Sequence, residues 1–148
     1  MKRLDRERKT KTLIFVFFFF MLAFIVCTAL QLMLSQWWLS TLSFAFVVIS
    51  MLAWAQIRAE NGNADSVPED QLDEYERSVL DTWRKRAMKV FALFNGIGGF
   101  AFMLTGELID HPGSTALIAA GYFMLFTFLI VYPLPMIGYA ITFNRKED

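Results

Sequence analysis

The chain has 148 residues, of which 56% are hydrophobic and 19% charged, and its 14 Lys and Arg balance its 14 Asp and Glu. A net charge of zero provides no positive field for a polyanion, so composition gives no support for nucleic-acid binding. The single cysteine, Cys27, excludes an internal disulfide and the paired-thiol chemistry of membrane thiol oxidoreductases.

Apolar residues gather in four blocks, at about 13–34, 37–57, 87–109 and 115–143. Each block is long enough to cross a hydrocarbon core of ~30 Å, which takes about 20 helical residues. The residues between the blocks are too few for a separate soluble domain. We therefore predict a single all-α membrane domain over 1–148, an integral four-helix bundle made of two antiparallel helical hairpins.

The first block also follows a basic start, as a secretory signal does. It is longer than the ~7–15-residue core of such signals, and no small-x-small cleavage site follows it at a useful distance. We therefore expect this block to be a membrane helix.

Lysine and arginine are confined to three segments, residues 2–11, 58–89 and 145–146. The turn after the first block and the turn after the third contain none. Because Lys and Arg of membrane proteins are retained on the cytoplasmic side, a single orientation that places all three segments there accounts for every Lys and Arg. We expect a multi-pass protein of the inner or plasma membrane, with both termini and the middle segment cytoplasmic.

The middle segment, about 58–86, separates the two predicted hairpins. Its first part is polar and contains Asn-Gly and Pro, which is typical of a loop. Ser66 and Glu69 have the spacing of a capping box, and Pro68 is tolerated in a first turn. These signals predict a cytoplasmic helix over 68–86 that continues without a break into the third membrane helix.

This predicted helix is amphipathic. An apolar stripe at spacings of three and four residues contains Leu72, Tyr75, Val79, Trp83 and Ala87. Its cationic end contains Arg84, Lys85, Arg86 and Lys89, at the expected depth of lipid phosphates. Two interpretations follow. The helix lies on the inner leaflet or against the N-terminal tail, or it docks a cytoplasmic partner protein.

Small residues indicate how the membrane helices pack. The third block presents Ala92, Gly96, Gly99, Met103 and Gly106 on one face, and the fourth offers Ala116 and Ala120. Small residues let membrane helices approach closely, so we predict that these two faces meet. Asn95 is expected to hydrogen-bond between helices, and Ser50 to its own helix backbone.

Two prolines, Pro133 and Pro135, stand inside the fourth block. Proline removes a backbone donor and clashes with the preceding turn, so we predict a kink or break there. A static kink that shapes a packing surface is the simpler interpretation, and a moving hinge is the alternative.

No ionisable residue lies in the central part of any apolar block. Small proton-coupled multidrug exporters depend on a membrane-embedded glutamate, so this class is disfavoured. Glu107, Asp110 and His111 in the second outer turn are donors of the kind that bind metals, but a turn is the simpler reading. We predict no catalytic residue, no cofactor and no metal.

The pattern DE-x-ER…R-x-x-A, here Asp73, Glu74, Glu76, Arg77, Arg84 and Ala87, precedes the third block. In this pattern and in layout the chain resembles small four-helix bacterial integral membrane proteins. The resemblance implies no activity and assigns no residue a role. We predict a non-catalytic accessory or regulatory subunit of a larger membrane complex, interacting through its membrane helices and helix 68–86. The alternative is a small homo-oligomeric channel or carrier.

Overall fold

The computed structural model describes residues 2–109 and 113–146, and this part of the chain is helical without strands. The α-helices are α1 (Lys2–Leu34), α2 (Trp37–Glu60), α3 (Glu74–Leu108), α4 (Ser114–Val131) and α5 (Leu134–Lys146), with a short 3-10 helix, η1 (Glu69–Gln71). Four stretches are long and apolar enough to cross a membrane: Glu7–Leu34, Trp37–Glu60, Glu74–Leu108 and Ser114–Phe143. The predicted all-α class with four candidate spans is confirmed.

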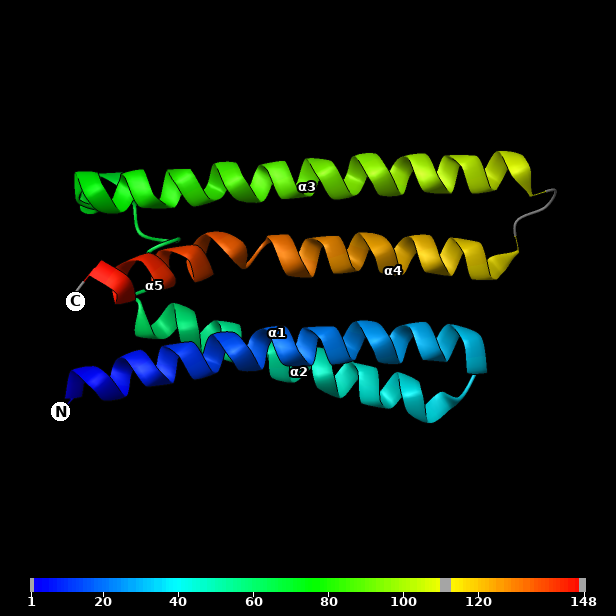
Figure 1. Cartoon of the computed structure of the whole chain (residues 1–148), viewed down its shortest axis with the longest axis horizontal. Helices are drawn as coiled ribbons and strands as arrows, with labels where there is room; N and C mark the ends of the chain where they lie inside the picture. Colours follow the sequence, from blue (N-terminus) through cyan, green and yellow to red (C-terminus); the bar gives the residue numbers. More distant parts are fainter. Residues whose placement is uncertain (1, 110–112, 147–148) are drawn as a thin grey trace.

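The helices lie side by side along the long axis of the molecule (Figure 1). The start of α1 and the end of α5 lie at one end, here called the terminal end, and the turn between α1 and α2, the end of α3 and the start of α4 lie at the far end. The path formed by α4 and α5 runs between α3 on one side and the α1–α2 pair on the other. Since α5 contacts both α3 and the α1–α2 pair, it joins the two halves of the chain.

The break between α4 and α5 falls at Pro133, and Pro135 lies in the first turn of α5. Helix α4 ends at Val131 and α5 begins at Leu134, so the interruption is centred on Pro133. After the break α5 continues along α3 to the terminal end instead of turning aside (Figure 1).

The start of α3 corrects the predicted capping box at Ser66 and Glu69. The Ser66 hydroxyl instead accepts a hydrogen bond from Arg58, and α3 begins eight residues after Ser66, at Glu74. The cap is Asp73, whose carboxylate accepts from the Glu76 backbone N–H at 2.6 Å, while Glu76 Oε2 accepts from the Asp73 N–H at 3.2 Å. A capping box is therefore present, but it lies seven residues later, because Leu72 is still extended.

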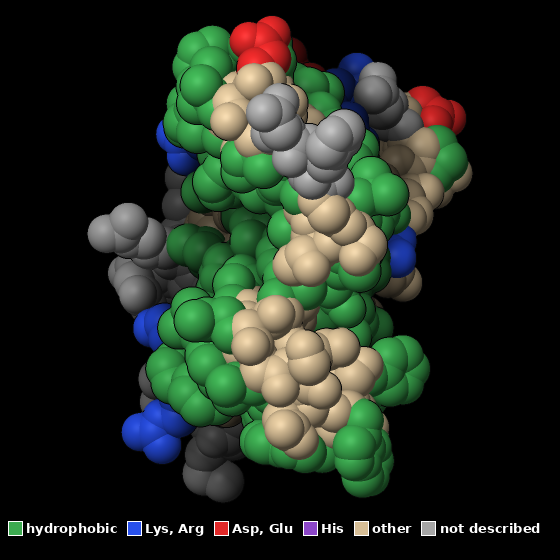
Figure 2. Space-filling model, turned by 90° about the vertical axis from the view of Figure 1, so that its right-hand side faces the viewer, with side chains coloured by type: hydrophobic (Ala, Val, Ile, Leu, Met, Phe, Trp, Pro, Cys, Tyr) green, Lys and Arg blue, Asp and Glu red, His purple; other side chains and the backbone are tan. Residues whose placement is uncertain are grey.

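The surface of the chain is strongly apolar. Large side chains point outward on every long helix, including Phe15 at 68% exposure, Phe44 at 71% and Leu117 at 78%. Figure 2, which looks along the molecule from the far end, shows hydrophobic side chains over most of the visible face. Such a surface is suited to lipid surroundings, as the lengths of the four candidate spans are.

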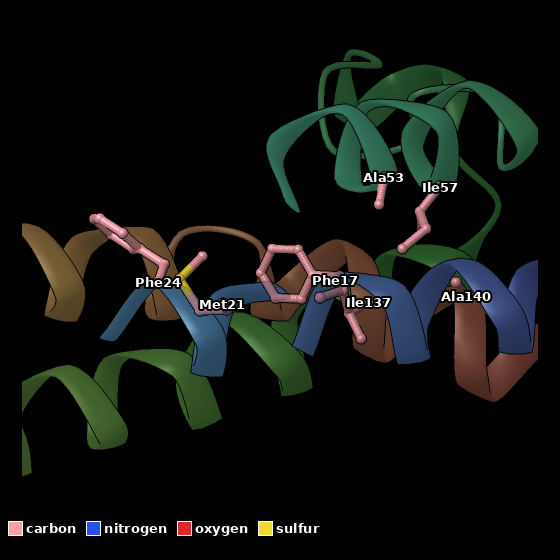
Figure 3. Packing of buried hydrophobic residues seen from close by; sticks show 7 residues of the cluster. All are labelled: Phe17, Met21, Phe24, Ala53, Ile57, Ile137 and Ala140. Carbon is pink, nitrogen blue, oxygen red and sulfur yellow. The ribbon is translucent and has the colours of Figure 1, made fainter. Parts of the chain in front are cut away.

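The main core lies where α1, α2 and α5 meet (Figure 3). Its buried residues are Phe17, Met21 and Phe24 of α1, Ala53 and Ile57 of α2, and Ile137 and Ala140 of α5. A polar contact accompanies this core, since the fully buried Ser50 hydroxyl donates to the Phe17 carbonyl oxygen at 3.0 Å. The prediction that Ser50 bonds to its own helix is wrong, because α1 passes closely enough to offer a free lone pair.

We predict that Ser50→Ala weakens the α1–α2 pair by about 0.6 kcal/mol, the average for interhelical hydrogen bonds in a membrane protein, and by no more than about 1.7 kcal/mol. The free energy of unfolding, measured by denaturing-detergent titration in mixed micelles, reports the change. Ser40→Ala is the matched control, because Ser40 is exposed on the same helix. Equal stabilities for the two variants would contradict the role assigned to the Ser50 hydroxyl.

Candidate functional site

The first half of α3 packs against α5 of the same chain. A second buried cluster contains Val79 and Leu80 of α3 with Met136 and Tyr139 of α5, and Ala64 of the connecting loop closes it. The ring of Tyr75 contacts Phe143, with centroids 5.5 Å apart. The Tyr139 hydroxyl donates to Glu76 Oε1 at 2.8 Å. The apolar stripe found in the sequence is therefore covered by the C-terminal helix.

Trp83 of α3 lies against Gly138 of α5. Its indole lies on Gly138, where an added Cβ would meet ring atoms at 2.0–2.4 Å. The indole N–H donates to Thr142 Oγ1 at 3.2 Å, and the Arg86 guanidinium carbon lies 4.7 Å from the ring centre. The indole N–H of Trp83 is therefore hydrogen-bonded, and its ring has a cation beside it.

These contacts show what lies on the apolar stripe of the helix. The sequence predicts the inner leaflet, the N-terminal tail or a partner protein there, and α5 packs on this stripe; docking of a partner by the rest of helix 68–86 stays a prediction. The first turns of α1 lie with α2, to which Lys9 is joined by an ion pair with Glu60. Among the predicted interaction residues, Tyr75, Val79 and Trp83 thus contact α5, whereas Lys85 and Lys89 point away and are exposed.

The second half of α3 meets α4 through Gly98. An added Cβ at Gly98 would lie 2.2 Å from the Phe123 ring, and Phe102 contacts the same ring at 5.7 Å. The small residues predicted to make this contact lie elsewhere. Gly96, Gly99 and Gly106 have no atom within 4 Å of the position of an added Cβ.

The other residues predicted to pack α3 against α4 are not seen to make the predicted contacts either. Ala92 is exposed, Ala116 and Ala120 are partly buried, and no atom of α4 lies within 4 Å of an added Cβ at Gly96, Gly99 or Gly106. Asn95 Nδ2 donates to the Phe91 carbonyl at 2.9 Å within its own helix, and does not bridge helices as predicted. The sequence pattern identified a real stripe of small residues but assigned it to the wrong side of α3.

Two exposed faces of α3 differ in side-chain size. One is bulky and contains Leu93, Ile97 and Phe100, each 60–62% exposed. The other, here called the open face, consists of Lys85, Lys89, Ala92, Gly96, Gly99, Met103 and Gly106. The spacing between its residues alternates between four and three. This repeat keeps one helix facing another along the seam of a coiled coil.

A groove separates α3 from α4 and α5 between the two glycine contacts. Its volume is about 550 Å³. The apolar walls include Met88 and Phe91 of α3, Phe128 and Val131 of α4, and Met136 of α5. Arg84, Asp65 and Ser66 also line it, so the groove has a polar end.

Among residues 2–109 and 113–146, no three His, Cys, Asp or Glu side chains come together as a metal site. Asp110 and His111 of the predicted outer turn lie outside the described residues. The chain matches no protein-family model, no curated protein sequence and no solved structure. Its function is therefore inferred from the surfaces of α3 themselves.

We predict that Gly138→Ala destabilises the chain by about 1–3 kcal/mol, because the new methyl group must displace the Trp83 indole. Gly121→Ala is the control, since an added Cβ there meets nothing within 4 Å. Gly121→Ala is expected to stabilise α4 by about 0.5–1 kcal/mol. Thermal unfolding in detergent micelles measures both, and a raised Tm for Gly138→Ala would contradict the close contact.

Proposed function

We propose that this protein is a non-catalytic accessory subunit of a larger membrane protein complex, and that it binds a partner's transmembrane helix through the open face of α3. Both termini lie in the cytoplasm, as the confinement of Lys and Arg to the terminal end and the connecting segment favours. The observation that carries the proposal is the exposure of Ala92, Gly96 and Gly99 along a single seam.

The contrast between the exposed faces of α3 supports this seam as a protein contact. Lipid chains accept large apolar side chains, and the bulky face with Leu93, Ile97 and Phe100 is suited to them. Small residues bring no advantage toward lipid, but they let two helix backbones approach closely. The small residues run from Ala92 to Gly106, and the whole open face, with its two lysines and Met103, extends over the 22 residues from Lys85 to Gly106, a length suited to another spanning helix.

The charge at the terminal end of the seam favours a different protein over a second copy. In a parallel two-fold pair of α3 helices, Lys85 and Lys89 would face their own copies. Like charges placed opposite each other are destabilising, whereas an acidic partner segment would pair with both lysines. No ion pair joins either lysine to an acidic group in the described part of the chain.

The α3–α5 contact gives the partner helix a rigid surface. Val79 and Leu80 are buried against α5, and α3 is one uninterrupted helix from its cap at Asp73 to Leu108 at the far end. The partner helix is therefore contacted in the membrane through the small residues and at the cytoplasmic surface through the lysines. Membrane lipids cover the bulky face.

A photo-crosslinking amino acid tests the seam in intact cells. We expect the probe at Met103, on the open face, to form a discrete adduct with another polypeptide. The same probe at Phe100, on the bulky face, should give lipid adducts only. Ala92→Leu should reduce the Met103 adduct about tenfold, because overpacking a helix contact costs about 1–3 kcal/mol.

The matched control is Ala101→Leu, which makes the same change at an exposed position of α3 outside the open face. It should leave the Met103 adduct unchanged. Mass spectrometry of the adduct identifies the second chain. An adduct of this protein with itself would replace the accessory role by the alternative, a homo-oligomeric channel or carrier. Equal lipid labelling at both positions would reject the open face as a protein contact.

A further inference from the structure

The groove between α3 and the α4–α5 path results from two close contacts and one helix break. The lack of a side chain at Gly98 lets α3 lie against Phe123, and the lack of one at Gly138 lets α5 lie against Trp83. Between these points the path of α4 and α5 is interrupted at Pro133, and the groove lies beside this break, with the buried Ala87 of α3 in its lining. A space of about 550 Å³ remains, which is within the ~300–1,000 Å³ range of ligand sites.

The chemistry of the groove changes along its length. Phe91 and Phe128 lie toward the far end and make apolar walls, both partly exposed at 41% and 54%. Arg84 lies two helical turns nearer the terminal end, about 10 Å away at 1.5 Å per residue. The occupant therefore has an apolar part in the membrane and an anionic group at Arg84.

Asp65, the acidic residue that lines the groove, is paired with a cation and therefore repels a bound anion only weakly. Asp65 Oδ1 accepts from Arg58 Nε at 3.0 Å, and the same arginine donates to Ser66. The ion pair with Arg58 neutralises the Asp65 carboxylate and holds the loop against the groove. Arg84 Nη1 lies 3.5 Å from Asp81 Oδ1, and the Arg84 side chain is 43% exposed, so a ligand in the groove can reach it.

We propose that this groove holds one phospholipid of the membrane leaflet at the terminal end, with an acyl chain between α3 and α4 and its phosphate on Arg84. Arginine binds phosphate through paired N–H donors, so a phosphodiester at this depth forms charge-assisted hydrogen bonds. The acyl chain of the lipid covers the apolar side chains that line the groove and that no other part of the described chain covers. The lipid thus completes the packing between α3 and α4, independently of any partner helix on the open face.

Native mass spectrometry of the full chain, released from mild detergent micelles with added phosphatidylglycerol, measures the bound lipid directly. We expect the wild type to retain one phospholipid. Arg84→Gln should weaken this retention on the order of tenfold, as expected for the loss of a hydrogen bond to a charged group. Lys85→Gln is the matched control, because it removes the neighbouring cation outside the groove and should retain the lipid.

Val131→Trp provides a second test, because it fills the apolar part of the groove and leaves the cations unchanged. It should release the lipid while the far-ultraviolet circular dichroism spectrum stays helical. Retention in both Arg84→Gln and Val131→Trp at the level of Lys85→Gln would overturn the proposal. So would equal loss from all three variants, which would describe lipid held by general charge at the surface.

Discussion

The contact between Trp83 and Gly138 is the constraint on which the rest of the structure depends. A glycine at this point lets α5 approach until the indole lies on its backbone, and Thr142 then accepts the indole N–H at 3.2 Å. Because α5 also supplies Ile137 and Ala140 to the core with α1 and α2, one short helix joins both halves of the chain. Helix α4 adds to this connection, since Phe126, Leu129 and Ile130 pack against the same core.

This arrangement explains why a water-compatible helix occurs in the middle of a very apolar sequence. Its apolar side is the support for α5, and its capping box at Asp73 sets where it begins. The same support places α3 at the edge of the molecule, where only 11% of its apolar span is buried. The exposed part of α3 is then divided into a bulky face, an open face and a groove, each suited to a different neighbour.

The sequence predicts the local features well because they depend on nearby residues. The four apolar blocks, the proline break at Pro133 and the amphipathic stripe at Val79 and Trp83 all follow from periodicity and backbone chemistry. The partners of these features were not predictable, because they depend on distances between helices far apart in the chain. Gly98 was overlooked because it does not belong to the regular stripe of Gly96 and Gly99, although of these three glycines only Gly98 lies against Phe123. A glycine near an aromatic residue at the same depth of the next helix was the available signal.

Disulfide formation between cysteines placed at Leu80 and Met136 tests most directly whether α5 covers the amphipathic face of α3. Both residues lie in one buried cluster, and the pair is introduced into a chain with Cys27→Ala. The structure predicts rapid crosslinking within a single chain, and little for the control pair Thr82 and Met136, since Thr82 is exposed. Crosslinking of the control pair as fast as the first, or none at Leu80 and Met136, would contradict the account.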